Sequence, residues 1–524
     1  MRIKFSGQLL GLACSSLLGC RAVAPPVPPP TAALSAPGPE TAKVFNVRAF
    51  GALGDGTTDD AGALQRAIDA CAAAGGGRVL VPGGATYLAG PFALKSHVEL
   101  CVESGARVLA HPDVNRYTTS AFRANPGEGT RWISADNAEQ ITLCGGGSID
   151  GNAPAFLGPL ADDGFIPKPG PDRRPHVLTL VGVRGLRIRD LAVGNSAYWN
   201  IHLAGCADVA ISDVTVRNDQ RVPNSDGLDH CRDVRVSNCH IESGDDAICL
   251  KNRREYAEFG PCENIAVANC TLTSRSCAFK IGSENVDSIR HVVVSNCLIT
   301  GSNRGVGIQN RDEGTVTDVV FANLVIESHF YSDGWWGKAE PIYVTAFRRP
   351  DGSAKGPNWR LPPGQTVGKV GAVRDIYFSN IKCRSENGIY VSGETADKVA
   401  GIYFDQVDVR LDKTTGRPGG VYDRRPAAQE GLVKAATSGF YLDHATGVVV
   451  RNSSVRWGLR RPAYYAHALE SHAVAGLQIS GLLGESAFPQ RLAAIKIDVT
   501  TEAPKGSARA DFSFMYRLFG ILRG

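Results

Sequence analysis

Two short acidic motifs carry the residues whose types and spacing could do chemistry. The first is Asn224-Ser225-Asp226-Gly227-Leu228-Asp229, and the second is Gly244-Asp245-Asp246. Carboxyl groups that are crowded together repel, which raises the pKa of at least one and leaves a protonated acid beside an ionised base. Cleavage of a glycosidic bond needs that pair, with an acid for the leaving oxygen and a base for the attacking water. The motifs therefore indicate acid–base chemistry of this kind, provided that the fold brings them together.

A repeated pattern supplies the elements that would position these motifs. From about residue 140, short apolar, largely β-branched runs recur on either side of one polar residue. The polar positions are Asp190, Asp213, Asn238, Asn269, Asn296, Asn323, Asn380 and Gln406. Most of them are 23 to 31 residues apart. A period of this size without intervening helices predicts a solenoid of β-coils, whereas a leucine-rich repeat would show its leucine spacing and a propeller would have longer strands and hairpin turns.

On such a solenoid the two acidic motifs fall one coil apart, because Asp245 follows Asp226 by 19 residues. Neighbouring coils are about 4.8 Å apart, so side chains of the two motifs can face each other on one sheet. The polar residue at each fixed position is expected to form a ladder at a turn, each member satisfying the backbone of the next coil.

The 14 cysteines follow the same repeat. Cys239, Cys270 and Cys297 share one phase, and Cys206, Cys231 and Cys262 share another. Cysteines that repeat with the coil are better explained as small apolar residues stacked inside the solenoid than as a disulfide scaffold. We therefore expect few or no disulfides.

A helix is predicted ahead of the coils. Thr57-Thr58-Asp59-Asp60 is a typical helix start, Leu64, Ile68 and Cys71 repeat at helical spacing, and Gly75-Gly76-Gly77 ends the run. The open end of a solenoid is an unpaired edge, which this helix is expected to cover. The predicted fold is all-β: a right-handed parallel β-helix with an N-terminal capping helix.

With its acidic motifs on such a solenoid, the sequence resembles glycoside hydrolase family 28, the polygalacturonase family, from about Phe45 to Asn323 and more loosely beyond. The segments that carry the resemblance are FNVRAFGALGDGTTDD, AYWNIHLAGCADVAI, NSDG, SGDDAICLKN, IGSE, NRGVGI and WWGKAEPIY. The resemblance implies hydrolysis of a pectin-type polysaccharide, either a galacturonan or a rhamnose-containing pectin.

By the same resemblance, Asp245 is the general acid, and Asp226 and Asp246 hold and deprotonate the water, with inversion at the anomeric carbon. No metal or organic cofactor is implied. Inversion rests on the resemblance alone, because one coil spacing is shorter than the roughly 6.5–9.5 Å that usually separates the carboxyl groups of inverting enzymes.

The sequence departs from the family pattern at two places. A Gly-His-Gly of the family reads Arg275-Ser276-Cys277 here, and its Arg-Ile-Lys reads Gly307-Ile308-Gln309. A glycine cannot replace the bidentate grip of a guanidinium on a carboxylate. These departures favour a rhamnose-containing or substituted pectin over plain polygalacturonate, and they leave an inactive homologue as an alternative.

The candidate substrate-binding residues come from the motifs and their surroundings. They are Asn224, Asp229, Lys280, Arg304, Arg311, Trp335 and Trp336. Lys280, Arg311 or Arg275 could supply the missing positive charge. The tryptophan pair, in a glycine-flanked loop, is the preferred platform for a sugar ring over Tyr198, Trp199 and Tyr343. His202 is expected to be packed, and His230 is a candidate for the role of the missing histidine.

The N-terminus predicts export. A basic start and a short apolar stretch lead to Leu17-Leu18-Gly19-Cys20, which resembles a bacterial lipobox, with acylation of Cys20. The stretch is too short to span a membrane, and a plain signal peptide is the alternative. Arg21, rather than an aspartate, favours the outer membrane. The predicted domains are a signal over 1–20, a Pro/Ala-rich tether over 21–43, a catalytic β-helix over 44–505 and a C-terminal tail over 506–524.

The charge balance limits the partners. A net charge of +4 without a long basic run argues against binding to nucleic acid. The expected partners are the polysaccharide and a membrane, through the lipid on Cys20, and the protein is expected to be a monomer. Two other functions remain open: a polysaccharide lyase on the same fold, which would need a uronate and would form an unsaturated product, and a surface module that binds glycans without cleaving them.

Overall fold

The structure is a computed structural model that describes residues 43–123, 128–160, 172–224, 228–229, 231–350 and 365–498. The predicted signal with Cys20, almost all of the predicted tether and the C-terminal tail lie outside these residues. Within them, no helix has the length and apolar character needed to cross a membrane.

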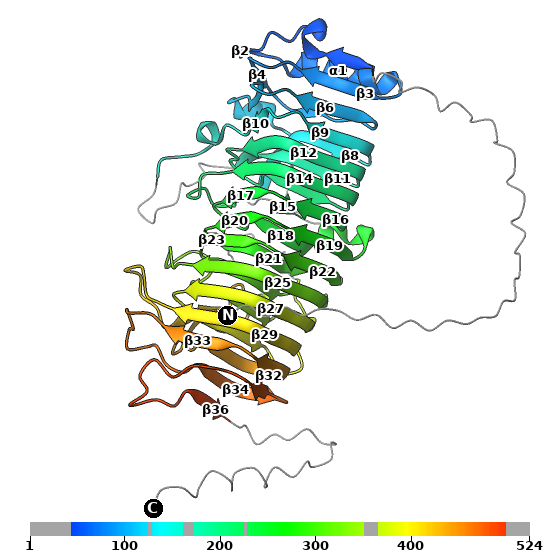
Figure 1. The fold of residues 1–524 in the computed structure, drawn as a ribbon. Coiled ribbons are helices and arrows are strands. Elements are labelled where there is room, and N and C mark those ends of the chain that lie inside the picture. The colour runs from blue at the N-terminus through cyan, green and yellow to red at the C-terminus, as the bar shows by residue number, and fades with distance from the viewer. Residues whose placement is uncertain are drawn as a thin grey trace, which may run out of the picture. The chain divides into compact units, whose positions relative to one another are not determined.

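The chain winds into a right-handed parallel β-helix whose coils stack along one axis (Figure 1). Each coil passes through three parallel sheets in turn. The first sheet contains β1 (Val44–Asn46), β3 (Gly77–Val81), β6 (Val98–Val102), β9 (Glu139–Cys144), β12 (Arg184–Gly194), β14 (Ala207–Arg217), β16 (Arg232–Ser237), β19 (Cys262–Ala268), β22 (Ile289–Ser295), β25 (Val316–Ser328), β27 (Val373–Ser385), β29 (Val399–Leu411), β32 (Phe440–Arg451) and β35 (Gln478–Ser480). The second contains β2 (Asp55–Asp59), β4 (Thr86–Ala89), β7 (Arg107–Ala110), β10 (Ser148–Asp150), β17 (His240–Ser243), β20 (Thr271–Ser274), β23 (Leu298–Ser302) and β33 (Ser454–Trp457), with the second halves of β12, β14, β25, β27 and β29.

The third sheet carries the candidate site. It contains β5 (Phe92–Ala93), β8 (Glu128–Asp136), β11 (Asp172–Val181), β13 (Ile201–Ala204), β15 (Leu228–Asp229), β18 (Ile248–Asn252), β21 (Cys277–Asn285), β24 (Arg304–Asn310), β26 (Ile342–Ala346), β28 (Ile389–Gly393), β34 (Leu469–Ala475) and β36 (Ile495–Asp498), with the first half of β32. An antiparallel pair, β30 (Val421–Asp423) and β31 (Leu432–Lys434), lies outside the three sheets. The short 3₁₀ helices are η1 (Val47–Phe50), η2 (Val114–Arg116), η3 (Ala153–Phe156) and η4 (Arg254–Phe259).

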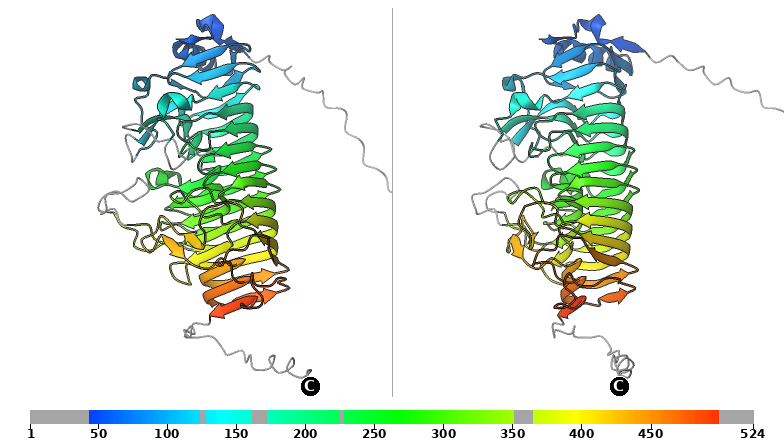
Figure 2. Two further views of the ribbon diagram at one scale, coloured as in Figure 1. Left: turned by 90° about the vertical axis from the view of Figure 1, so that its left-hand side faces the viewer. Right: turned by 60° about the vertical axis from the view of Figure 1, so that its left-hand side comes forward.

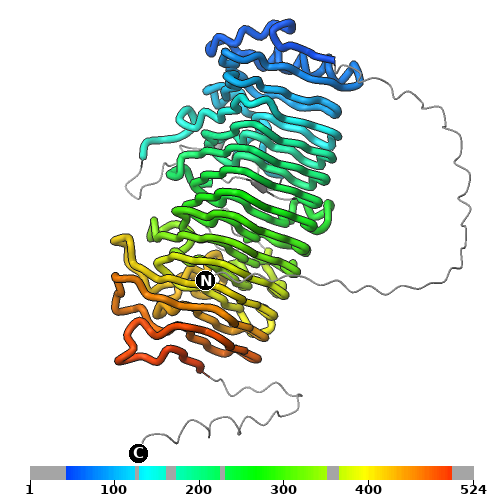
Figure 3. The backbone as a smooth tube through the Cα atoms, viewed as in Figure 1, coloured from blue at the N-terminus to red at the C-terminus, as the bar shows by residue number. Residues whose placement is uncertain are grey.

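Register between coils builds the core. In the first sheet Val234, Ile265, Val292, Val319 and Ile376 are successive backbone partners, and all are buried. The tube in Figure 3 follows a similar path in successive coils, which is why the same inward positions recur. Alternate residues of each strand point to opposite faces, so the apolar residues of every coil stack in one continuous core.

The bend between the first and second sheets explains the repeated polar residue. All eight of the polar positions have a left-handed backbone, with φ between 51° and 57°. Asparagine and aspartate tolerate this conformation better than other residues with a side chain. The predicted ladder is confirmed, with one difference: the amide of Asn323 donates to Asn296 (3.1 Å), and that of Asn380 donates to Asn323 (2.8 Å), rather than to backbone. The main chain there is satisfied by the next coil, as in the bond from the Asn296 N–H to the Ala322 carbonyl.

The cysteines stack as predicted. The twelve cysteines of the described residues are buried thiols. Both phased sets belong to the apolar core. The backbone N–H of Cys206 lies 2.9 Å from the Cys231 sulfur, and the Cys262 thiol donates to the Cys231 carbonyl on the preceding coil.

The capping helix is also confirmed. Helix α1 (Ala61–Ala73) lies at the N-terminal end of the stack and buries Leu64, Ile68 and Cys71 (Figure 1). The predicted start is partly wrong, because residues 57–59 form the end of strand β2. Asp60 does not cap the helix with its side chain but accepts hydrogen bonds from the N–H groups of residues 53 and 54. Asp59 instead accepts a bond from the first helical N–H, at 3.0 Å.

The left-handed backbone of the polar ladder can be tested by substitution at Asn296. Replacing Asn296 with alanine should lower the free energy of unfolding, because an alanine pays about 1–2 kcal/mol to hold this conformation. Asn296→Gly loses the same amide but accepts the backbone without that strain, so it should be the milder change. Urea unfolding of both variants measures the difference. Equal loss in the two variants would show that the amide contacts, and not the backbone, dominate.

Candidate active site

The second acidic motif lies at the turn from the second sheet to the third. Residues 244–247 join β17 to β18. Long connections leave the coils at this same turn, including residues 111–123, 151–160, 329–341 and 412–439. Figure 2 shows cyan, yellow and orange loops projecting on one side of the stack, while the neighbouring face is formed by regular strands. The motif therefore sits where the fold concentrates its variable segments.

The two acidic motifs are on neighbouring coils, as predicted. Strand β15 pairs with β18, which places Leu228 beside Ile248 and Asp229 beside Cys249. The side-chain amide of Asn224 lies 3.4 Å from the Asp245 carboxyl, so it joins the first motif to the second. Asp226, the Asp229 side chain and His230 lie outside the described part of the chain.

Asp245 is held in a nearly closed environment. Only 5% of it is exposed. One carboxyl oxygen accepts the N–H of Asp246 at 2.9 Å, and the hydroxyl of Ser274 donates to the Asp245 carbonyl at 2.6 Å. Burial, and then the adjacent charge of Asp246, raise the pKa of Asp245 to about 6, against the opposing effect of Lys280 and Lys251. Asp245 therefore keeps its proton to a higher pH than an ordinary aspartic acid.

Asp246 has different neighbours, although it is the next residue. It is 1% exposed, and both its oxygens are occupied. The Ser276 hydroxyl donates to one at 2.8 Å, and the Lys280 ammonium donates to the other at 2.8 Å. Burial lowers the pKa of Lys280, but the charges of Asp246, Cys249 and Asp245 together outweigh burial, and the pKa of Lys280 is raised overall. Both carboxyl oxygens of Asp246 therefore accept a hydrogen bond, one of them from a cation.

Lys280 is the predicted binding residue that the structure brings to the acidic cluster. Its neighbours across the third sheet are Cys249 on one side and Gly307 on the other, followed by Tyr343. At Gly307 a methyl group would lie 3.0 Å from the sulfur of Cys277. A side chain at Gly307 would therefore press on Cys277, which would have to shift by a few tenths of an ångström.

The structure gives Arg304 and Arg311 internal partners, in contrast to the expected contact with substrate. Arg304 is 3% exposed, forms an ion pair with Glu340 at 3.0 Å and lies 3.7 Å over the ring of Tyr343. Arg311 is fully buried and donates to the Arg424 carbonyl at 2.7 Å. Burial of long cations demands such partners. Both arginines hold the loop around β30 against the third sheet.

Trp335 and Trp336 lie half-buried in the loop that precedes β26. This loop interlocks with the one that follows β30. The Arg425 side chain donates to the Trp335 carbonyl at 2.9 Å, and its guanidinium lies 5.3 Å from the Trp336 ring. The Gly337 N–H donates to Asp423 at 3.0 Å. Neither tryptophan is part of the core. Both lie in residues 329–341, a connection from the second sheet to the third, as residues 244–247 are for the second acidic motif.

The remaining aromatic candidates are packing residues. Tyr198 and Trp199 are at most 5% exposed and form a cluster with Phe122. Tyr343 is also buried, and His202 packs against the same aromatic cluster, 4.9 Å from the Trp199 ring. Packing of His202 was predicted.

Two residues near the acids were missed in the sequence. Ser276 was treated as part of a lost motif, yet it donates to Asp246. Lys251 lies 4.5 Å over the Trp199 ring and 3.6 Å from Glu284. Without the register between coils, nothing in the sequence connects them to the aspartates.

Comparison with known proteins identifies the family of this chain. The sequence profile of Glycosyl hydrolases family 28 matches residues 71–332, half of the chain, and that segment contains both acidic motifs. The chain belongs to glycosyl hydrolases family 28.

Individual family 28 members are distant relatives. A protein named "Probable polygalacturonase" from Vitis vinifera is 29% identical over 263 residues, which cover 46% of this chain and 52% of the relative. An exo-poly-alpha-D-galacturonosidase from Dickeya chrysanthemi is 27% identical over 253 residues, 39% of this chain and 41% of the relative. The matches thus span about half the length of these relatives.

Solved exopolygalacturonase structures share the fold. The exopolygalacturonase of Yersinia enterocolitica aligns with a TM-score of 0.62 at 18% identity, over 84% of this chain and 78% of the other. A hyperthermoactive exopolygalacturonase from Thermotoga maritima aligns with a TM-score of 0.53 at 18% identity, over 85% and 92%. At these identities the likeness concerns the β-helix and not the substrate.

Lys280 provides a test of the electrostatics. The Lys280 charge lowers the pKa of Asp245, so replacing Lys280 with methionine should raise that pKa further above 6. If protonated Asp245 is the active form, the alkaline limb of the kcat/KM profile should move to higher pH in Lys280→Met. Lys280→Arg keeps the charge and is the control. An alkaline limb at the same pH in all three proteins would contradict the arrangement.

Arg304 provides a test of its internal role. Arg304→Met leaves Glu340 buried without its cation, which should cost about 3–5 kcal/mol of stability. The double variant Arg304→Met/Glu340→Leu removes both charges and should recover most of the loss. Urea unfolding measures both. If Arg304 contacted substrate instead, the single variant would keep its stability and show a raised KM.

Proposed function

We propose that this family 28 member is a glycoside hydrolase that cleaves a pectin-type polysaccharide. The observation that carries the proposal is the unequal pair at the second motif. Asp245 is buried beside a negative charge and has a pKa of about 6, whereas Asp246 accepts from an ammonium and a hydroxyl. One carboxyl is thus suited to donate a proton and the other to accept one.

In the proposed reaction, Asp245 gives its proton to the glycosidic oxygen as the bond to the anomeric carbon breaks. Asp246 and Asp226 hold a water and take its proton as its oxygen bonds to that carbon from the opposite side. The products are two shorter sugars, with inversion at the anomeric carbon, and Asp245 regains its proton from solvent. Asp226 precedes Asp229 by three residues, as Asp246 precedes Cys249, the strand partner of Asp229. No metal or cofactor enters these steps.

The proposed substrate is a rhamnose-containing or substituted pectin. Two observations support this preference. Gly307 carries no cation, and the side-chain amide of Gln309 donates to the Arg425 carbonyl. Lys280, the cation in contact with the acidic pair, already has Asp246 as its partner. A neutral sugar at this position needs no additional cation. Asn224, Asp229 and the tryptophan pair are proposed to contact the sugar rings.

The proposed setting is the bacterial outer membrane. Cys20 would carry a lipid, and residues 21–43 would tether a monomeric catalytic β-helix to it. The proposal rests on the lipobox-like Leu17-Leu18-Gly19-Cys20 and on the proline-rich composition that follows.

The test is product analysis on polygalacturonate, a rhamnogalacturonan backbone, branched pectin and an aryl rhamnoside. We expect release of sugar from a rhamnose-containing substrate, with kcat reduced by about 10²–10⁴-fold in Asp245→Asn. Asp213→Asn makes the same change at an exposed ladder position and should retain activity. In the wild type, kcat/KM should fall as pH rises through about 6, because Asp245 then loses the proton that it donates.

Three results would contradict the proposal. Strong release from polygalacturonate would overturn the preferred substrate. A product that absorbs in the ultraviolet would indicate a lyase. Binding without cleavage, equal in the wild type and Asp245→Asn, would indicate a glycan-binding module.

A further inference from the structure

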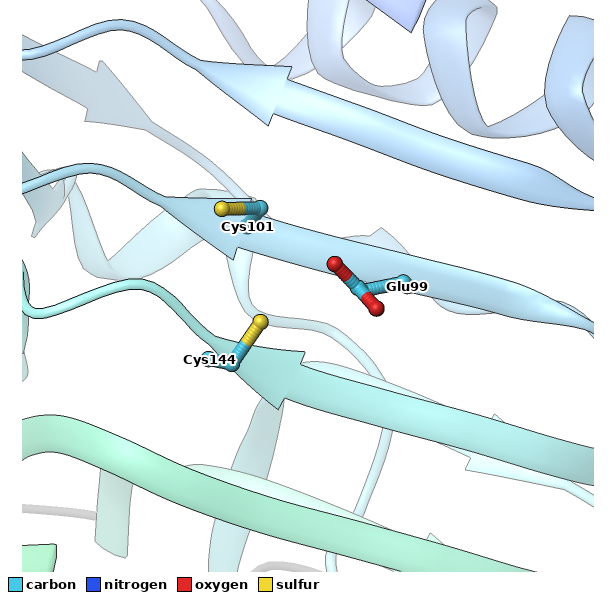
Figure 4. A group of neighbouring side chains, drawn as sticks. All are labelled: Glu99, Cys101 and Cys144. Carbon is cyan, nitrogen blue, oxygen red and sulfur yellow. The ribbon is translucent and has the colours of Figure 1, made fainter. Parts of the chain in front are cut away.

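A second cluster of reactive side chains lies on the first sheet, away from the acidic turn. Glu99 and Cys101 belong to β6, and Cys144 belongs to β9. Figure 4 shows the three side chains gathered at these two neighbouring strands. The carboxylate oxygen and the two sulfurs all lie within 4.8 Å of one another. Among the residues that the structure describes, no other group of three such side chains brings its donor atoms this close.

The strands place these groups together on the outer face. Leu100 and Leu143 point into the core, so Glu99, Cys101 and Cys144 point outward by alternation. Cys101 and Cys144 are direct backbone partners in parallel register. This outward position separates them from the two core ladders of cysteine, whose six thiols lie in the apolar core.

We propose that Glu99, Cys101 and Cys144 form a zinc site. Two thiolates and one carboxylate are a donor set that suits the borderline-soft Zn²⁺ ion and not Ca²⁺ or Mg²⁺, which prefer oxygen. Around tetrahedral zinc these donor atoms are about 3.5–3.8 Å apart, as follows from bonds of about 2.0–2.3 Å. Small side-chain rotations therefore close the cluster onto the ion, and a water completes the coordination.

The surroundings support an ion with bound thiolates. Glu99 accepts a bond from Arg78 at 2.5 Å through one oxygen, which leaves the other for the metal and orients the carboxylate. Arg189, paired with Asp190, also acts electrostatically on Cys144. These two arginines offset part of the charge of two thiolates and a carboxylate. Binding of the ion displaces the thiol protons to solvent.

The proposed role is to join β6 to β9 near the capped end of the solenoid. A ligand that binds only the folded state stabilises it. Zinc should therefore raise the Tm of the wild-type protein, and the increase should be absent in Cys101→Ser/Cys144→Ser. Cys239→Ala/Cys270→Ala removes two thiols from a core ladder and should keep the zinc-dependent increase, whatever its own Tm.

The direct test uses Co²⁺ as a spectroscopic probe of the reduced, metal-free full chain. We expect one equivalent to bind with thiolate-to-cobalt charge-transfer absorption, and Zn²⁺ to displace it. The absorption should disappear in Cys101→Ser/Cys144→Ser and persist in Cys239→Ala/Cys270→Ala. Glu99→Gln should keep the absorption but weaken binding by about tenfold or more.

Three outcomes would overturn the proposal. The first is no charge-transfer absorption in the wild type when thiol titration shows both cysteines reduced. The second is absorption that survives in Cys101→Ser/Cys144→Ser. The third is a disulfide between Cys101 and Cys144 in protein purified without reductant, if that disulfide re-forms after reduction faster than metal binds. The pair would then be a covalent cross-link and not a metal site.

Discussion

The parallel pairing of each coil with the next is the constraint on which the other features depend. Because neighbouring strands run in the same direction and keep register, a residue's neighbours are set by its position in the coil and not by nearby sequence. The constraint stacks valine on isoleucine in the core and asparagine on asparagine at the bend. It also brings Lys280 to Asp246 from 34 residues away. The core, the asparagine ladder and the acidic site therefore all depend on the spacing of about 4.8 Å between neighbouring coils.

At the acidic turn this register makes two adjacent aspartates chemically unequal. Asp245 faces buried surroundings and the charge beside it, and its pKa rises. Asp246 receives Ser276 and Lys280 from the following coil. The difference does not arise from the motif itself, since both residues are aspartates in one turn. It arises from the burial of Asp245 and from the partners that the next coil places against Asp246, and it is the feature that supports an acid beside a base.

The loops beside the site provide partners for several polar side chains of the third sheet. Arg304, Arg311 and Gln309 point from the third sheet and are occupied by carbonyl or carboxylate groups of residues 340 and 423–425. Residues that could have met a substrate therefore hold the loop that flanks the site. The same loop meets the tryptophan-bearing loop through Arg425. Family membership and fold do not determine this arrangement, because both segments lie beyond the part of the chain that the family profile matches.

The sequence by itself determined the repeat, the polar ladder, the stacked cysteines, the capping helix and the adjacency of the two acidic motifs. The repeat, the ladder and the cysteines recur at the coil period. The helix is evident from its own helical spacing, and the adjacency of the acidic motifs from a separation close to one coil. Only the tertiary structure decided which cations bind the aspartates and which bind loop residues. Lys280, Arg304 and Arg311 look alike in sequence as cations near a motif. Their partners are set by coil register and by loops up to 119 residues away, and burial then obliges each charge to keep the partner that it meets.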